Sequence, residues 1–147
     1  MSALEFLDTN VLVYAYDPGE PRKQQIAQSL VRRAVAGEIV ASSQVLGEFA
    51  ATLLHKLKPS AKPEELMLLL DTLGPIKLVS LDGDAILRAV QAHAQYGIHF
   101  YDGMIVAAAE RGGCRKIWSE DFNANQEYFG IAVENPFARL ETPKEKN

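Results

Sequence analysis

The sequence predicts an α/β domain with a central, mainly parallel sheet that is covered by helices on both faces. Short apolar runs typical of buried strands alternate with longer stretches whose apolar residues recur about every 3.6 residues. Such alternation favours parallel strands joined by crossover helices. In sheets of this kind, ligands bind beyond the carboxyl ends of the strands. Polar residues that directly follow a predicted strand are therefore the first candidates for a functional site.

The first half of the chain supplies two predicted strands and three predicted helices. Each helix has apolar residues at helical spacing and is bounded by residues that start or stop helices, such as proline in the first turn and glycine after the last. In chain order, the segments are a strand at 4–7 that ends at Asp8, a helix from Pro21 to the stop at Gly37, a strand at 39–41, a helix capped by Ser42 or Ser43 that runs to Leu57, and a leucine-rich helix from Pro63 to Leu73.

The second half adds three predicted strands and two predicted helices. The last helix has no polar face before Glu110, so we expect it to be buried on all sides. In chain order, the segments are a strand at 76–80, a helix capped by Asp82 that runs to Gly97, a helix that begins at Asp102 and ends at Gly112-Gly113, a strand at 115–118 and a strand at 131–133.

Length and composition are those of one ordinary globular domain. The 147 residues are 48% hydrophobic and 23% charged, as in soluble proteins. We expect the domain to cover residues 1–138 and residues 139–147 to form a charged, flexible tail. Cys114 is the only cysteine, no secretory signal is recognisable, and no apolar run approaches the ~20 residues that span a bilayer. These features predict a cytoplasmic protein without a membrane segment.

Asp8 is the first candidate site residue because it follows the first predicted strand directly. It should project from the carboxyl edge of the sheet, where Thr9 and Asn10 can hydrogen-bond its carboxylate or a bound water. The alternative is an ordinary strand-to-helix turn, in which Asp and Asn are common.

Asp121 is the second candidate and lies just past the predicted strand at 115–118. Ser119 and Asn123 flank it and can position a metal-bound water. The alternative is a polar loop that contains two acidic residues.

Two further acids belong to predicted helices. Asp102 opens the apolar helix, where the helix dipole favours its ionised form; the alternative is an ordinary helix cap. Glu48 is expected in the first turn of its helix, where the helix end can overhang the sheet edge. On a helical wheel it lies about 60° outside the buried arc, so a plain surface glutamate is the alternative.

Taken together, these acids at the carboxyl edge predict a divalent-metal site. Only a metal ion makes the mutual repulsion of several converging carboxylates tolerable, and hard oxygen ligands favour Mg²⁺ or Mn²⁺ over zinc. The histidines, which are His55, His93 and His99, lack metal-ligand spacing. One or two metal ions at this site would activate a water for in-line attack on a phosphodiester. The net charge of −4 argues against a protein that holds nucleic acid over a broad surface.

The chain resembles the PIN-domain nucleases, and within them the VapC-like toxin ribonucleases of prokaryotic toxin–antitoxin pairs. The resemblance extends over nearly the whole chain, from the opening Asp8-Thr9-Asn10 to Asn135-Pro136-Phe137. Its most specific pieces are that opening, the helix Tyr101–Ala109 and the segment Ser119–Phe122. Tyr101 stands where tryptophan is frequent, and Gly103 stands where alanine is frequent, which loosens the helix start by up to ~1 kcal/mol.

The resemblance implies a three-layer α/β/α fold and a metal-dependent endoribonuclease. It implies that Asp8, Glu48, Asp102 and Asp121 hold Mg²⁺ or Mn²⁺, with support from the positions of Asn10 and Ser119. It also implies an RNA substrate, a cut that leaves a 5′-phosphate and a 3′-hydroxyl, a homodimer and an antitoxin partner whose tail covers the site. Asn125-Gln126 replaces a commoner glycine-glutamine pair, which leaves Gln126 a doubtful site residue.

Three alternatives remain open. The first is a phosphotransfer module, but the phosphatases of this kind place a second aspartate where Asn10 stands, and a receiver needs an acidic pair and a central phosphoacceptor. The second is a binding module that keeps the scaffold without hydrolysis, which the retention of all four acids argues against. The third is a PIN-domain nuclease of RNA processing that is not a toxin.

Overall fold

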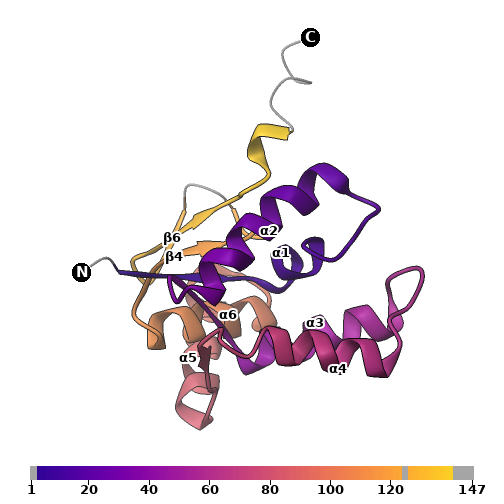
Figure 1. Ribbon diagram of the computed structural model, residues 1–147. Coiled ribbons are helices and arrows are strands. Elements are labelled where there is room, and N and C mark those ends of the chain that lie inside the picture. Colours follow the sequence, from indigo (N-terminus) through magenta and orange to yellow (C-terminus); the bar gives the residue numbers. More distant parts are fainter. Residues whose placement is uncertain (1–2, 124–125, 141–147) are drawn as a thin grey trace.

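A computed structural model of the protein describes residues 3–123 and 126–140 (Figure 1). Its centre is a sheet in the strand order β3-β2-β1-β4-β6-β5. Every neighbouring pair is parallel except β5 with β6. The strands are β1 (Leu4–Leu7), β2 (Ile39–Ser42), β3 (Leu78–Val79), β4 (Cys114–Trp118), β5 (Glu127–Tyr128) and β6 (Ile131–Glu134). The predicted α/β class with a mainly parallel sheet is therefore confirmed.

Helices cover both faces of this sheet. Figure 1 shows α1 and α2 on one face, α5 and α6 on the other, and α3 with α4 projecting to one side. The helices are α1 (Thr9–Tyr14), α2 (Pro21–Val35), α3 (Ser43–His55), α4 (Pro63–Thr72), α5 (Gly83–Tyr96) and α6 (Phe100–Arg111). None of the helices within the described residues is long and apolar enough to cross a membrane.

Two elements were not predicted from the sequence. The short helix α1 begins directly after Asp8, where the sequence analysis placed no helix. The strand β5 forms a hairpin with β6 through Phe129 and Gly130, both of which have positive φ angles of 51° and 79°. Such a turn is usually built from Asn-Gly or Asp-Gly, so a phenylalanine at its first position gives no sequence signal.

The strand order places a topological switch point between β1 and β4. From β1 the chain builds β2 and β3 on one side, and it later returns to add β4 and β6 on the other. Leu7 pairs with Trp118, and the Asp8 amide continues the ladder by donating to the Trp118 carbonyl at 3.1 Å. The residues that follow these two strands therefore leave the same edge of the sheet side by side, where such folds bind ligands.

The amino-terminal half of β1 carries a buried charge that was not expected. Glu5 is only 4% exposed. Its carboxylate accepts from Arg33 Nη2 and Trp118 Nε1, each at 2.8 Å, and from Arg115 Nη2. Burial raises the pKa of Glu5, but the Trp118 and Arg33 hydrogen bonds and the nearby positive charges outweigh it and hold the pKa below its usual value. These contacts tie β1 to α2 and β4.

The buried helix α6 packs closely on α5, as its apolar composition predicts. Its residues from Ile105 to Ala109 are all buried. At Gly103 the two helices approach so closely that an added Cβ would lie 2.5 Å from the backbone oxygen of Ala89. Gly103 therefore also makes room for α5, a packing role that the sequence analysis did not predict.

The predicted tail begins inside the described part of the chain. Arg139 belongs to a helical turn, and Leu140 in the same turn packs against the core. The remaining residues of the predicted tail, 141–147, lie outside the described residues. The boundary between domain and tail stays a prediction.

Candidate metal centre

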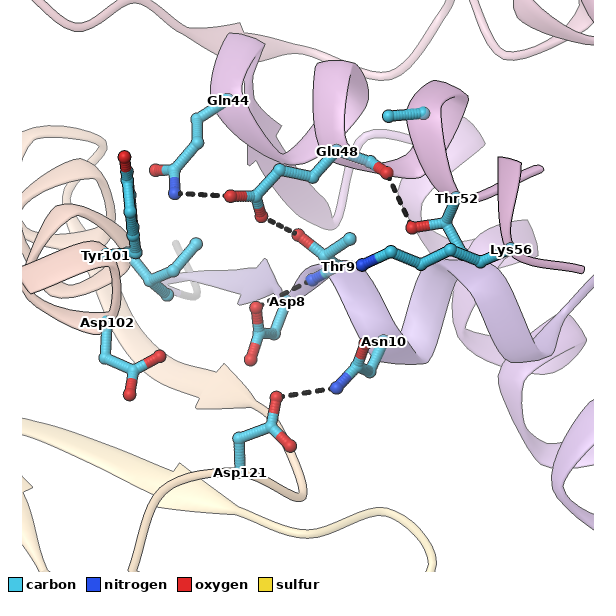
Figure 2. Close-up of a pocket in the computed structure, with 12 residues that line it drawn as sticks. Asp8, Thr9, Asn10, Gln44, Glu48, Thr52, Lys56, Tyr101, Asp102 and Asp121 are labelled. Carbon is cyan, nitrogen blue, oxygen red and sulfur yellow. Dashed lines mark hydrogen bonds between the residues drawn. The ribbon is translucent and has the colours of Figure 1, made fainter. Parts of the chain in front are cut away.

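A pocket of about 320 Å³ lies beyond the carboxyl ends of β1 and β4 (Figure 2). Its lining includes all four acids predicted from the sequence, which are Asp8, Glu48, Asp102 and Asp121. They come from four different segments, namely the end of β1, α3, α6 and the loop after β4. Figure 2 shows the carboxylates of Asp8, Asp102 and Asp121 turned toward a common space, with Glu48 above them.

Asp8 is the most deeply buried of the four, at 5% exposure. Its Oδ1 accepts from the Thr9 amide at 2.7 Å, so that it caps α1, and its Oδ2 accepts from Ser119 Oγ at 2.6 Å. Burial raises the pKa of Asp8 to about 6; the two hydrogen bonds oppose this rise, and the charges of Asp121 and Asp102 add to it. A carboxylate in this situation is stabilised by any cation that binds beside it.

Ser119 connects Asp8 to Asp121. Its buried hydroxyl donates to Asp8 and accepts from the Asp121 amide at 3.0 Å, which fixes the start of the loop after β4. The Asp121 carboxylate accepts from Asn10 Nδ2 at 2.7 Å. Burial and the charge of Glu120 raise the pKa of Asp121, although the Asn10 hydrogen bond lowers it in part. Asn10 and Ser119 thus hold the two aspartates in place.

Asp102 does not begin its helix, contrary to the prediction. α6 starts at Phe100, His99 is the capping residue, and Asp102 is the third helical residue. The preceding element is also a helix, α5, so Asp102 does not stand at a strand–helix junction. It still lies in the first turn, where the helix dipole favours a negative charge. Burial raises its pKa, as do the charges of Asp121 and Glu48, whereas His99 lowers it.

Glu48 lies in the second turn of α3, not in the first turn as predicted. Its side chain is exposed on the helix surface but lines the pocket. Its Oε1 accepts from Thr9 Oγ1 at 2.9 Å and its Oε2 from Gln44 Nε2 at 3.1 Å. Thr9 thereby joins α1 to α3 and orients Glu48 toward the aspartates.

Asn123 is not among the residues that line the pocket. Its amide donates weakly to Gln126 Oε1, at 3.5 Å. The three histidines do not line the pocket either, although His99 caps α6 beside it. Asn125 lies outside the described residues.

A cluster behind the pocket was missed by the sequence analysis. Glu120, next to Asp121, accepts from Tyr14 Oη at 2.7 Å and from Lys23 Nζ at 3.0 Å. Lys23 also lies 4.6 Å from the Tyr14 ring centroid and 5.3 Å from that of Phe137. The cluster ties the loop after β4 to α1 and α2. It also pairs the negative charge of Glu120 with the Lys23 ammonium. No local sequence signal marks it, since Lys23 and Glu120 are 97 residues apart.

The donor set of the pocket fits Mg²⁺ or Mn²⁺. All candidate ligands are carboxylate oxygens, and burial together with the charge of neighbouring carboxylates raises the pKa of each of the three aspartates. Within residues 3–123 and 126–140, no three His, Cys, Asp or Glu side chains form a ready-made metal cage. Mg²⁺ does not require such a cage, because it keeps several waters and binds directly through one or two carboxylates. The pocket therefore suits a partly hydrated ion.

Comparison with known proteins identifies the family. The family model of the PIN domain matches residues 6–127, which include all four acids. The chain belongs to the PIN-domain family. A search of curated proteins found no match.

Solved structures with the same fold include members of toxin–antitoxin complexes. VapC20 of Mycobacterium tuberculosis, a toxin that cleaves the sarcin–ricin loop, has 16% identity and a TM-score of 0.61 over 87% of this PIN-domain chain and 98% of its own. FitAcB from Neisseria gonorrhoeae has 17% identity and a TM-score of 0.62 over 91% and 99%. VapBC2 from Rickettsia felis, bound to promoter DNA, has 18% identity and a TM-score of 0.62 over 90% and 98%. At these identities, the similarity establishes the fold.

Proposed function

We propose that this PIN-domain protein is a divalent-metal-dependent endoribonuclease and the toxin of a VapBC-type toxin–antitoxin pair. The observation that carries the proposal is the convergence of Asp8, Asp102 and Asp121, with Glu48 beside them, in one pocket at the topological switch point. A cluster of ionisable groups with raised pKa in a cleft is a candidate for a functional site on physical grounds.

The proposed ligands of Mg²⁺ or Mn²⁺ are the four carboxylates. Ser119 hydrogen-bonds both Asp8 and Asp121, and Asn10 hydrogen-bonds Asp121, so protein contacts position this pair. When bound, the cation supplies the positive charge that stabilises the transition state of phosphodiester hydrolysis and makes water more acidic.

The side chains themselves bind and orient and do not attack the phosphate. The carboxylates would be engaged in holding the metal and its water, so we expect hydrolysis by water without a covalent enzyme intermediate. The expected products carry a 5′-phosphate and a 3′-hydroxyl.

The toxin role is supported by the solved structures that share this fold. FitAB and VapBC2, which resemble this chain in fold, are named as two-component complexes and are described bound to DNA. We propose that this chain likewise has a cognate antitoxin and forms a homodimer, and that it acts in the cytoplasm.

The test is cleavage of a panel of structured and single-stranded RNAs with Mg²⁺, with Mn²⁺ and with EDTA, by wild type and by Asp8→Ala. We expect cleavage that requires the metal and is lost in Asp8→Ala. Failure of folded, inhibitor-free wild type to cut any RNA would favour a silent binding module. Cleavage without growth arrest on expression would favour a PIN-domain nuclease of RNA processing.

A further inference from the structure

Tyr101 offers an aromatic surface at the mouth of the acidic pocket. It lines the pocket next to Asp102, yet 56% of its surface is exposed. Its ring lies nearly parallel to that of His99, with a centroid distance of 5.6 Å and an interplanar angle of 19°, and edge-on to that of Phe100 at 5.5 Å. The Tyr101 amide also donates to His99 Nδ1 at 3.2 Å. The ring is therefore held in place while much of it stays open to solvent.

Such a ring is suited to stacking on a nucleobase. Stacking uses the aromatic face, which every base can offer, and depends little on sequence. A ring that is already ordered loses little conformational entropy when a ligand binds. Tyr101 thus has the exposure, the order and the position beside the acids that a base-stacking residue needs.

Lys56 is the cation that lines the same pocket. It lies at the carboxyl end of α3, and Figure 2 shows it extending toward the pocket on the side away from Tyr101. Among the described residues it makes no salt bridge, whereas Lys23 and Lys116 are each paired with a glutamate. A lysine ammonium without a carboxylate partner is available to a phosphate oxygen.

The pocket is small. Its volume of about 320 Å³ is at the small end for ligand sites and suits one nucleotide. A base can stack on Tyr101 only if it is unpaired and turned out of its own stack. Protein recognition of RNA commonly uses loops and single strands for this reason.

We propose that Tyr101 and Lys56 form a subsite for one unpaired nucleotide of the RNA, with the base on the Tyr101 ring and a backbone phosphate against Lys56. This inference rests on the proposed ribonuclease function and assigns two of its substrate-binding residues. The acids then lie between the two contacts, where the scissile phosphate of that strand is placed.

The first test compares steady-state cleavage of one RNA, as a single strand and as a duplex with its complement. The assay uses wild type and the variants Tyr101→Phe, Tyr101→Leu, Lys56→Gln and Lys58→Gln. Lys58→Gln is the control, because Lys58 is an exposed neighbour that does not line the pocket. We expect Tyr101→Leu to raise KM about 5- to 150-fold with little change in kcat, and Tyr101→Phe to behave as wild type. Lys56→Gln should raise KM. It should also reduce the slope of the logarithm of RNA affinity against the logarithm of salt concentration by about 0.7, whereas Lys58→Gln should change neither quantity.

Failures of the two proposals give different results. If wild type cleaves RNA but Tyr101→Leu matches it, or if the duplex is cut as fast as the single strand, the subsite is refuted and the nuclease stands. If wild type cuts no RNA, the nuclease itself is refuted. A binding readout independent of cleavage uses Asp8→Asn protein and a single strand containing 2-aminopurine. Stacking on Tyr101 should quench the fluorescence of the 2-aminopurine. Equal quenching by Asp8→Asn and by the double variant Asp8→Asn/Tyr101→Leu would overturn the proposal.

Discussion

At the scale of single residues, Asp8 has an unfavourable environment for its charge in the protein without metal. Its carboxylate is almost fully buried, close to two other aspartates, and its pKa is raised to about 6. The pKa of an unfolded aspartate is about 3.9, so the ionised form is less favourable in the folded state. Above pH 6 this charge therefore opposes folding, and the penalty is relieved as the pH falls from 6 toward 4.

We predict that Asp8→Asn stabilises the metal-free protein at pH 8 by about 1–3 kcal/mol, since one pKa unit corresponds to about 1.4 kcal/mol. Asparagine can still accept from the Thr9 amide and can donate to Ser119 Oγ. Urea unfolding in EDTA at pH 8 and pH 4.5 measures the difference, which should shrink at the lower pH. A variant that is less stable than wild type at pH 8 would contradict the account of Asp8.

Single residues also show which contacts could be predicted from the sequence and which could not. Asp8 follows β1 directly and Asp121 is the third residue after β4, so the sheet edge places both of them and the sequence predicts their meeting. Glu5 and Glu120 gave no such signal, because their partners, Arg115 and Lys23, come from distant parts of the chain. Charge pairs of this kind depend on the finished fold.

At the scale of elements, α5 and α6 approach each other most tightly at one glycine, where a Cβ would not fit. A Cβ at Gly103 would meet the Ala89 backbone oxygen at 2.5 Å, and a backbone atom cannot swing aside. We predict that Gly103→Ala destabilises the protein by about 1–3 kcal/mol despite the higher helix propensity of alanine. The free energy of unfolding in urea measures the loss.

Gly47 is the matched control for this prediction. It lies inside α3, and nothing stands within 4 Å of a Cβ added there. Gly47→Ala should stabilise the protein by about 0.5–1 kcal/mol because alanine favours the helix. Equal effects of the two substitutions would show that close packing at Gly103 is not decisive.

The loop after β4 is held by the pairing of Lys23 with Glu120. Both side chains are largely buried, at 22% and 17% exposure. We predict that Lys23→Met costs about 1–3 kcal/mol, because it leaves the Glu120 carboxylate without a cation. Amide hydrogen exchange at 120–122 should become faster, whereas the exposed neighbour substitution Arg22→Met should change neither quantity. Unchanged exchange in Lys23→Met would mean that the cluster does not hold this loop.

Element boundaries were predicted well where local signals exist. Asp82 and Gly97 bound α5 as expected, with Gly97 in the left-handed conformation. The start of α6 was misplaced because His99, a less common capping residue, takes the position assigned to Asp102. The β5–β6 hairpin was missed because the Phe129-Gly130 turn lacks the usual residues.

At the scale of the whole molecule, the four acids meet beside the topological switch point between β1 and β4. The alternation of strands and helices predicts a parallel sheet, but strand order does not follow from periodicity. Glu48 and Asp102 reach the pocket only because α3 and α6 lie at this edge. The sequence therefore predicted four acids that line one pocket and did not predict how the helices bring two of them there.

The same arrangement predicts that a divalent cation stabilises the fold. A ligand present at 100 times its dissociation constant adds about 2.7 kcal/mol to the free energy of unfolding. For a chain of this length, that corresponds to a rise in Tm of about 5–10 °C. Thermal unfolding with and without Mn²⁺ should show this rise in wild type and in Asp71→Asn, an exposed acid on α4. Asp121→Asn should lose most of it. A rise that is equal in all three proteins would place the ion elsewhere.

The most direct test of the central claim is the single-turnover cleavage rate of one RNA as Mn²⁺ is titrated, for wild type, Asp8→Asn and Asp71→Asn. We predict a rate that rises with Mn²⁺ and saturates in wild type and Asp71→Asn, and that falls at least about 100-fold in folded Asp8→Asn. Cleavage that is independent of metal, or that is as fast in Asp8→Asn as in wild type, would contradict the assignment of this pocket as a metal-dependent ribonuclease site.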